Sequence, residues 1–199
     1  MLLFGKTFKR APRPVLKSLL ILVGLFGLAA CAPSNYYVLS TASQPSVSYV
    51  SKRRVIGVEK VTLPKYLFKR EIAVAKSPSQ VTFLNDAVWA EDLDSGLTRR
   101  LIGFLQKKFN QPEIYLYPWG LDTQPSLKVK VQITRFIAYH DKVYLDASWE
   151  VEDMQSHKRF ARLFTTVVPS GKKASEIVSA MDRAFGMLEE DVSRGIKGF

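Results

Sequence analysis

Apolar residues recur at every fourth position in the middle of the chain, which is the spacing of an amphipathic helix. The repeat runs through Trp89, Leu93, Leu97, Leu101 and Leu105. Acids lie near its start and lysines near its end, as the helix dipole favours. Asn85 or Asp86 can cap the first turn, and the Asn-Gln-Pro sequence at 110–112 ends it. The pattern therefore predicts a helix that begins soon after residue 86 and stops before residue 112.

A second helix is predicted in the last part of the chain. It begins near Ala174, after the turn sequence Pro-Ser-Gly at 169–171. Its apolar residues fall on one face, namely Ile177, Met181, Ala184, Leu188, Val192 and Ile196. Both predicted helices therefore need a partner layer that covers their apolar stripes.

Between the helices, apolar and polar residues alternate as in a sheet with one wet face. The first run spans 127–138 and changes phase near 134–135, which predicts a β-bulge. A turn at 140–141 leads to a second run over 143–151, and a third follows over 160–168. We expect these three strands to form an antiparallel meander.

Shorter β-rich segments precede and follow the first helix. They lie at 35–39, at 55–58 continuing through 61–63, at 71–75, at 80–84 and at 113–117. Two amphipathic helices and a sheet with one apolar face can bury those faces only against each other. The sequence therefore predicts an α+β fold, a two-layer sandwich of a mostly antiparallel sheet with two amphipathic helices.

The start of the chain has the three-part layout of a secretory signal peptide. Five Lys and Arg residues and no acid occur in it, an apolar stretch spans 19–28, and small residues end it. This stretch is shorter than the roughly 20 apolar residues of a membrane-spanning helix. We therefore expect residues 1–30 to be a signal peptide that is removed.

Cys31 is the one cysteine of the sequence and follows Leu28, Ala29 and Ala30. This arrangement resembles the signal of a bacterial lipoprotein. The resemblance implies cleavage before Cys31, an S-diacylglycerol on its thiol and an N-palmitoyl group on its new amine. Two or more acyl chains anchor a protein stably, because each buried methylene adds about 0.8 kcal/mol. The alternative is a free or buried thiol after an ordinary signal peptide.

Ala32 follows the cysteine, where lipoproteins kept at the inner membrane commonly carry Asp. We therefore expect anchoring in the outer membrane of a Gram-negative bacterium, facing the periplasm. Residues 31–54 are interpreted as the lipidated N-terminus, a tether and a short strand, and residues 55–199 as a single globular domain. A linker of this composition is flexible, so the domain is expected to stand a little way off the membrane.

The leader also accounts for much of the positive charge. The whole chain is +11, but without the leader 24 Lys and Arg face 18 Asp and Glu, a net charge of +6. This excess lies in small clusters, so a nucleic-acid partner is not expected. A basic face that contacts anionic lipid and an ordinary solvated face are both open interpretations.

No residue set in the sequence has the spacing of a catalytic or metal site. His140 and His157 belong to no metal-ligand motif, and neither a GxSxG elbow nor a glycine-rich phosphate loop is present. Glu91, Asp92 and Asp94 are close together, but negative charge is also favourable in a first helical turn. We therefore expect no enzymatic activity, no cofactor and no metal ion.

Two aromatic segments are candidates for binding a partner. Tyr66, Leu67 and Phe68 follow Pro64 and lie between lysines, and exposed apolar groups with a basic rim often mark an interaction surface. The same residues can equally fold down as a lid on the sheet. Trp119 lies at a turn and is open to both interpretations.

Three segments, in this order, resemble the ABC-type transport auxiliary lipoproteins, which include the paraquat-inducible protein C lipoproteins. The first is Tyr-Tyr-Val-Leu at 36–39, soon after the cysteine. The second is Ile-Gly-Val at 56–58 with Val-Thr-Leu-Pro-Lys-Tyr-Leu at 61–67. The third is Trp-Ala-Glu-Asp-Leu at 89–93, leading into the helix and followed by Tyr-Pro-Trp at 117–119.

The resemblance implies a periplasmic lipoprotein that works with an ABC transporter and a substrate-binding protein of the mammalian-cell-entry (MCE) type. Such a system moves lipids or hydrophobic compounds between the two membranes, and this chain would anchor and dock without making or breaking bonds. A ring-shaped partner also implies a homo-oligomer. The alternatives are a lipid carrier in its own right and a structural envelope lipoprotein.

Overall fold

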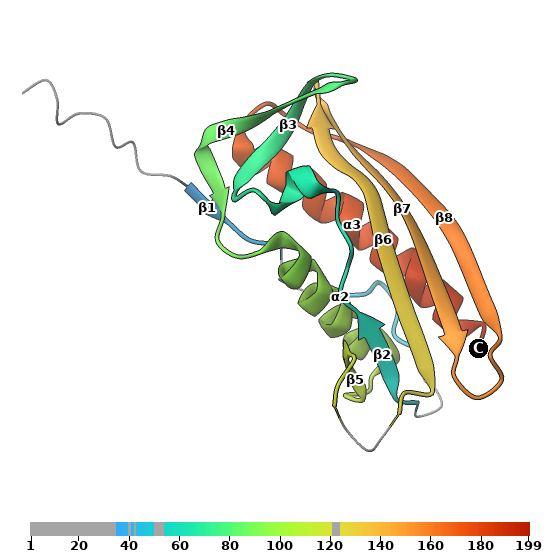
Figure 1. Ribbon diagram of the computed structural model, residues 1–199. Coiled ribbons are helices and arrows are strands. Elements are labelled where there is room, and N and C mark those ends of the chain that lie inside the picture. Colours follow the sequence, from blue (N-terminus) through green and yellow to red (C-terminus); the bar gives the residue numbers. More distant parts are fainter. Residues whose placement is uncertain (1–34, 40, 42, 50–53, 121–123) are drawn as a thin grey trace, which may run out of the picture. The chain divides into compact units, whose positions relative to one another are not determined.

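An eight-stranded sheet and two long helices dominate the part of the chain that the computed structural model describes, residues 35–39, 41, 43–49, 54–120 and 124–199 (Figure 1). In chain order the elements are β1 (Asn35–Tyr37), β2 (Ile56–Glu59), the 3-10 helix η1 (Lys65–Phe68), β3 (Glu71–Ser77), β4 (Gln80–Trp89), α2 (Leu93–Phe109), β5 (Ile114–Tyr117), β6 (Leu127–Tyr139), β7 (Lys142–Asp153), β8 (Arg159–Pro169) and α3 (Ala174–Lys197).

The strands β6, β7 and β8 form the antiparallel meander that the alternating pattern predicted. β6 pairs with β7 from end to end, and β7 pairs with β8 along nearly its whole length. The ladder between β6 and β7 shifts between Ile133 and Arg135, which confirms the predicted bulge. His140 turns the chain between the two strands with a positive φ of 53°.

The other edge of β6 receives two shorter groups of strands, one at each end. β2 pairs in parallel with the start of β6, with Ile56 opposite Leu127, and carries β5 on its outer side. β3 pairs in parallel with the end of β6, with Val74 opposite Ala138, and carries β4 and then β1. The long pairs are antiparallel as expected, whereas the sequence pattern does not predict these short parallel ones.

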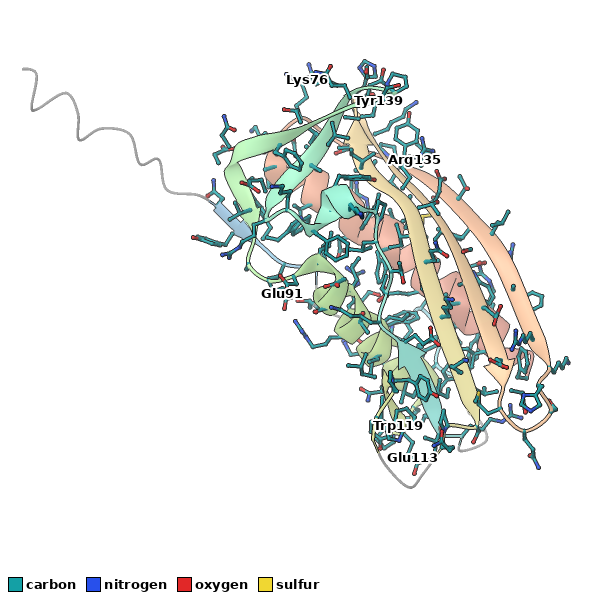
Figure 2. All side chains as sticks on the ribbon, in the orientation of Figure 1. Lys76, Glu91, Glu113, Trp119, Arg135 and Tyr139 are labelled. Carbon is teal, nitrogen blue, oxygen red and sulfur yellow. The ribbon has the colours of Figure 1, made fainter. Side chains whose placement is uncertain are left out.

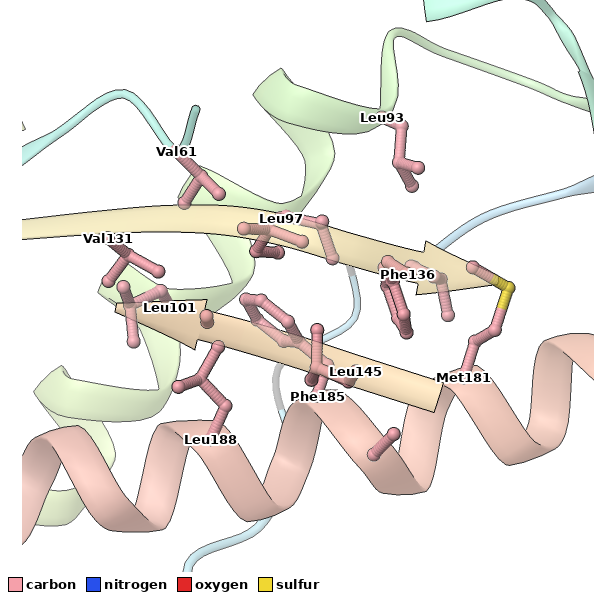
Figure 3. Packing of buried hydrophobic residues seen from close by; sticks show 14 of the residues in the cluster. Val61, Leu93, Leu97, Leu101, Val131, Phe136, Leu145, Met181, Phe185 and Leu188 are labelled. Atoms are coloured by element: carbon pink, nitrogen blue, oxygen red, sulfur yellow. The ribbon is translucent and has the colours of Figure 1, made fainter. Parts of the chain in front are cut away.

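The helices α2 and α3 form the second layer of the fold and cover one face of the sheet (Figure 1). α3 packs on β7 and β8, and α2 packs on β2 and β5. The apolar stripe predicted for α3 is buried from Ile177 to Ile196. Figure 3 shows side chains of both helices directed toward Val131 and Leu145 of the sheet. The predicted α+β two-layer sandwich is therefore confirmed.

The predicted start of the first helix is wrong. Trp89 is the last residue of β4, and α2 begins at Leu93 after its N-cap residue Asp92. Asn85 and Asp86, which the sequence suggested as caps, lie within β4. β4 extends this far because β1 pairs with its last three residues. Trp89 is a buried residue of a strand. Its separation of four residues from Leu93 therefore does not reflect a helical turn.

The predicted strand over residues 61–63 is also wrong, because β2 ends at Glu59. Of these three residues, Thr62 forms an isolated bridge to β6. The N–H of Val61 donates to the side-chain oxygen of Thr98 on α2 (2.9 Å). The chain is therefore held toward the helix layer at this point and continues into η1 instead of extending the sheet.

Much of the segment interpreted as a tether is packed against the rest of the protein. β1 pairs with β4 at one edge of the sheet. Residues 43–49, here called the strap, cross both helices. The Ser43 hydroxyl donates to Glu189 of α3 (2.8 Å), and the Tyr49 N–H donates to the carbonyl of Lys108 on α2 (2.6 Å). The sequence predicted a flexible linker here. These residues are instead held against the folded part of the protein.

A buried ion pair joins the two helices beneath the strap. Arg100 of α2 and Glu189 of α3 are both fully buried and share hydrogen bonds of 3.1 and 3.2 Å. Arg100 also donates to Asp182 (2.5 Å). Burial raises the pKa of the Glu189 carboxyl to about 7, although Arg100 and the Ser43 hydroxyl lower it. Because the two helices and the strap contribute to this cluster, it fixes all three relative to one another.

Trp149 of β7 is wedged against α3. Its indole N–H donates to Asp191 (2.9 Å), and its ring lies so close to Gly195 that a Cβ atom there would overlap it. Glycine inside a helix costs about 1 kcal/mol relative to alanine. The close contact with Trp149, itself a buried core residue, explains why a glycine occupies this position.

Gly195→Ala is expected to lower the free energy of unfolding by about 2 kcal/mol, because the added methyl group must displace the Trp149 ring. Urea denaturation of the chain without its leader measures the change. Gly186→Ala on the same helix is the matched control, since a Cβ there meets no atom closer than 3.7 Å. That variant should keep or raise stability, and an equal loss in both would contradict the packing argument.

Glu189 is expected to make the protein less stable as the pH rises. A carboxyl whose pKa is higher in the folded state binds its proton more tightly when folded. Its contribution is therefore fully present below its ordinary pKa of 4.5 and is lost as the pH passes about 7. Urea denaturation between these pH values should show a decline on the order of 1 to 3 kcal/mol.

Glu189→Gln should remove most of that decline, because it keeps an oxygen acceptor for Arg100 without a titratable group. Glu190→Gln is the control. Burial acts to raise the pKa of Glu190, but its hydrogen bond with Lys108 brings that pKa below the ordinary value of 4.5. Its contribution therefore changes only at lower pH. A decline that persists unchanged in Glu189→Gln would show that another group causes it.

Candidate docking surface

The candidate lipid site lies outside the described residues. Cys31 and the recognition residues Leu28, Ala29 and Ala30 belong to the part of the chain without a described structure, so their roles stay predictions. In the part that is described, no helix is long and apolar enough to cross a membrane. The candidate partner-binding residues, by contrast, can all be located.

Tyr66, Leu67 and Phe68 form most of η1 and differ sharply in exposure. Leu67 is buried, Tyr66 is half-buried, and Phe68 is 60 % exposed. The Leu67 N–H donates to the carbonyl of Pro64 (3.0 Å), which begins the 3-10 turn. Two of the three residues therefore fold down toward the sheet, and one large apolar side chain remains at the surface.

Tyr66 fills a gap at the edge of β6. On this edge, β6 bridges Thr62 at Gln132 and is next paired with β3 at Ala138. Between these points the N–H of Phe136 donates to the Tyr66 hydroxyl (3.2 Å). Burial raises the pKa of Tyr66, although the hydrogen bond from Phe136 lowers it. The Tyr66 hydroxyl accepts a backbone hydrogen bond that a neighbouring strand accepts elsewhere along this edge. Tyr66 therefore stabilises the sheet.

Trp119 belongs to an aromatic cluster at the other end of β6. Its ring centroid lies 5.8 Å from that of Tyr115 and 5.6 Å from that of Tyr117, both of β5. A Cβ atom at Gly57 of β2 would come within 3.1 Å of the Trp119 ring, so glycine lets the ring pack closely on β2. Tyr115 of this cluster is 47 % exposed, and Leu116, on the other face of β5, is 51 % exposed. The cluster is therefore an accessible apolar surface on an edge strand.

The structure does not bring the four candidate residues together. Gly57, beneath Trp119, pairs with Lys128 at the start of β6, whereas Tyr66 contacts Phe136 near its end. Eight residues of extended strand separate the two contacts, or about 26 Å. Figure 2 likewise shows Trp119 at the opposite end of the molecule from Tyr139. The predicted set therefore comprises two distinct surfaces.

An ion-pair ladder crosses the sheet beside the aromatic cluster. The Lys128 Nζ lies 3.0 Å from Glu152 of β7 and 3.8 Å from Glu59 of β2, and Arg159 of β8 lies 2.9 Å from Glu152. The hydrogen bond with Glu152 raises the pKa of Lys128, and the hydrogen bonds from Lys128 and Arg159 lower the pKa of Glu152. Four strands are thus linked through their charged side chains. The alternating polar positions indicated this wet face, but not which charges would meet.

Two of the three neighbouring acids at the start of α2 form ion pairs. Asp94 forms an ion pair with Lys60 (2.7 Å), and Glu91 forms one with Arg99. Asp92 is the N-cap residue of α2. Both histidines lie in turns, and among the described residues no group of His, Cys, Asp and Glu is arranged to hold a metal ion. The described part of the chain forms a folded scaffold with exposed apolar surfaces.

Two known lipoproteins are similar to this chain in sequence. A lipoprotein named intermembrane transport lipoprotein PqiC from Escherichia coli (strain K12) is 29 % identical over 140 residues, which cover 67 % of this chain and 73 % of the relative. The protein of that name from Shigella flexneri matches to the same extent.

Two solved structures share the fold. One is an uncharacterised protein with a TM-score of 0.68 and 21 % identity, matched over 83 % of this chain and 99 % of that one. The other is a protein from Xanthomonas campestris with a TM-score of 0.65 and 14 % identity, matched over 81 % and 93 %.

A family model described as the ABC-type transport auxiliary lipoprotein component matches residues 37–193. This range begins in β1 and ends within the last turns of α3, so it spans the sheet and both helices. The family is one of transport components and not of enzymes. The chain belongs to the family of ABC-type transport auxiliary lipoprotein components.

Proposed function

We propose that this protein is a lipid-anchored, periplasm-facing subunit of an ABC/MCE-type system that moves lipids or hydrophobic compounds between membranes. It acts by anchoring and docking, with no chemical step of its own. The observation that carries the proposal is the exposed aromatic cluster on the edge strand β5, set on a scaffold of the transport auxiliary family. The name of the PqiC relatives, intermembrane transport lipoprotein, supports the same role.

The anchor in this proposal is Cys31. After cleavage at Ala30, the thiol carries S-diacylglycerol and the amine carries an N-palmitoyl group, which together hold the protein stably in a membrane. Ala32 is the residue that favours the outer membrane. The same anchor places the folded part in the periplasm.

The docking site in this proposal is the edge strand β5, which has the aromatic cluster of Tyr115, Tyr117 and Trp119 on one face and the exposed Leu116 on the other. Apolar and aromatic side chains with about half of their area exposed are the usual anchors of protein interfaces. Among the described residues β5 pairs only with β2. On its second edge the Ile114 carbonyl accepts from Gln106, so the part of that edge at Leu116 is where an extended segment of a partner can add. The partner is the MCE-domain protein that spans the periplasm. Tyr66 and Leu67 contribute indirectly, since they hold η1 on the sheet.

Homo-oligomerisation is part of the same proposal and is supported by β8. This strand is the other edge of the sheet, and it exposes Leu163 (83 %), Phe160 (45 %) and Val167 (46 %). Large apolar residues on an open edge strand favour pairing with a further chain. A second copy of the protein would cover them.

Cys31→Ala is expected to abolish acylation and to release the protein from membranes, because the thiol is the attachment point. Intact-mass spectrometry and membrane fractionation of the protein produced in a Gram-negative host measure both effects. Ala32→Asp should keep the acyl mass and move the protein to the inner membrane. Full membrane retention of Cys31→Ala would contradict the anchor.

A photoreactive amino acid in place of Leu116 is expected to crosslink an MCE-domain protein in cells. Met187 on α3 is the matched control, because its exposed fraction of 49 % is close to the 51 % of Leu116. Mass spectrometry identifies what is trapped at each position. Trapping of lipid alone at position 116 would contradict docking and favour a lipid carrier.

Leu116→Asp should weaken the complex with that partner at least tenfold, which is about 1.4 kcal/mol, since it buries a charge at the interface. Met187→Asp, tested in the same pull-down and titration, should leave the affinity unchanged. Equal effects of the two substitutions would place the docking site elsewhere.

A further inference from the structure

We infer that the edge of the sheet formed by β1, together with the exposed end of η1, rests on the surface of the bilayer that holds the acylated cysteine. The contact residues are Tyr36, Val38 and Phe68. This inference rests on the proposed acylation of Cys31 and adds to it a defined face of the protein. The occupant of that face is the phospholipid surface itself.

The first argument is the length of the chain between the anchor and the fold. Three residues separate Cys31 from Asn35, the first residue of β1. Four steps of fully extended chain span about 14 Å at most. The beginning of β1 therefore cannot be farther than this from the cysteine, and the acyl chains begin at that cysteine. A linker this short keeps the adjacent edge of the sheet near the lipid headgroups.

The second argument is that β1 is held in place. It pairs with the last three residues of β4, and the Ala90 N–H donates to the Tyr37 carbonyl (2.8 Å). The Asn35 side chain donates to the Asp86 carbonyl (3.3 Å), and Leu39 is buried. The linker between Cys31 and the fold can lengthen only if these contacts break. The membrane therefore meets a structured edge and not the end of a loose tail.

The third argument is what that edge exposes. Tyr36 is 67 % exposed and Val38 is 48 % exposed, although both belong to the packed N-terminal segment. Phe68 lies close by, because the Trp89 N–H donates to the carbonyl of Arg70, two residues after Phe68 (2.6 Å). Trp89 is also the residue that pairs with Tyr37. Two strand spacings, about 10 Å, therefore separate Arg70 from β1.

The chemistry of this edge fits a bilayer interface. Tyr and Phe place an apolar ring at the depth of the headgroups, where a Tyr hydroxyl stays hydrated. Lys69 and Arg70 are exposed beside Phe68 and can reach lipid phosphates. Glu71 and Asp86 at the same edge offset that charge, so the rings contribute more to the contact than the cations do.

The inferred contact gives the protein an orientation. The aromatic cluster around Trp119 lies about 26 Å along β6 from the level of η1. With the β1 edge on the membrane, that cluster is held away from the lipid. The docking site proposed above then faces the space between the membranes.

Fluorescent labels at single positions of the mature, acylated protein test this inference. The one natural cysteine is blocked by acylation, so Tyr36→Cys and Phe68→Cys can each be labelled alone with an environment-sensitive dye. Tyr115→Cys and Met187→Cys are matched controls, since these residues are exposed by 47 % and 49 %. The vesicles contain phosphatidylethanolamine and phosphatidylglycerol in equal parts, with or without a nitroxide-bearing lipid.

We expect blue-shifted emission and nitroxide quenching at positions 36 and 68, and the emission of a dye in water at positions 115 and 187. Emission of a dye in water at all four positions, in protein that floats with the vesicles, overturns the inference and leaves the anchor intact. Equal quenching at all four positions overturns it as well, because the contact would then have no defined face. Protein that carries no acyl mass and does not float overturns the anchor and this inference together.

Discussion

The one-sided burial of β6 is the constraint on which the rest of the structure depends. Its inner face is covered by the helix layer, one edge is fully paired with β7, and the other edge is shared between β2 at its start and β3 at its end. No single strand covers that second edge, because Thr98 draws the chain at Val61 toward α2. The hydroxyl of Tyr66 completes the edge. This division produces two separate surfaces, the aromatic cluster at one end and the β1 and η1 region toward the other.

Polar contacts connect the two helices of the helix layer. These contacts orient the helices more than they add to the free energy of unfolding. Arg100 and Glu189 are removed from water, and the desolvation of such a pair commonly offsets most of its Coulomb attraction. A buried guanidinium has few acceptable positions for its partners, so the pair defines how α2 and α3 lie against each other. The bond from Ser43 adds the strap to the same cluster. The N-terminal segment is thereby fixed at the helices as well as at β1.

The sequence predicts the parts of this fold that have a local period. The apolar stripe of α3 and the alternation through β6, β7 and β8 are visible in consecutive residues, and both are confirmed. The start of α2 could not be predicted, because Trp89 belongs to a strand through its pairing with β1, more than 50 residues earlier, and through its hydrogen bond to Arg70. The same holds for the candidate sites. Residue types identified Phe68 and Trp119 as notable, but only the register of β6 shows that they lie far apart.

With the anchoring and docking proposed above, a rigid domain on a short linker has a physical advantage. A binding site on a long flexible tether samples a large volume, and its effective concentration at a fixed partner falls as the tether lengthens. Here β1, the strap and the ion-pair cluster hold the N-terminal segment against the fold, so little free chain is left in the described part of it. The ion-pair ladder through Lys128 and Glu152 links β2, β6, β7 and β8 beside the aromatic cluster at the other end. A site held in this way is presented at a nearly constant height and orientation, and less entropy is lost when a partner binds it.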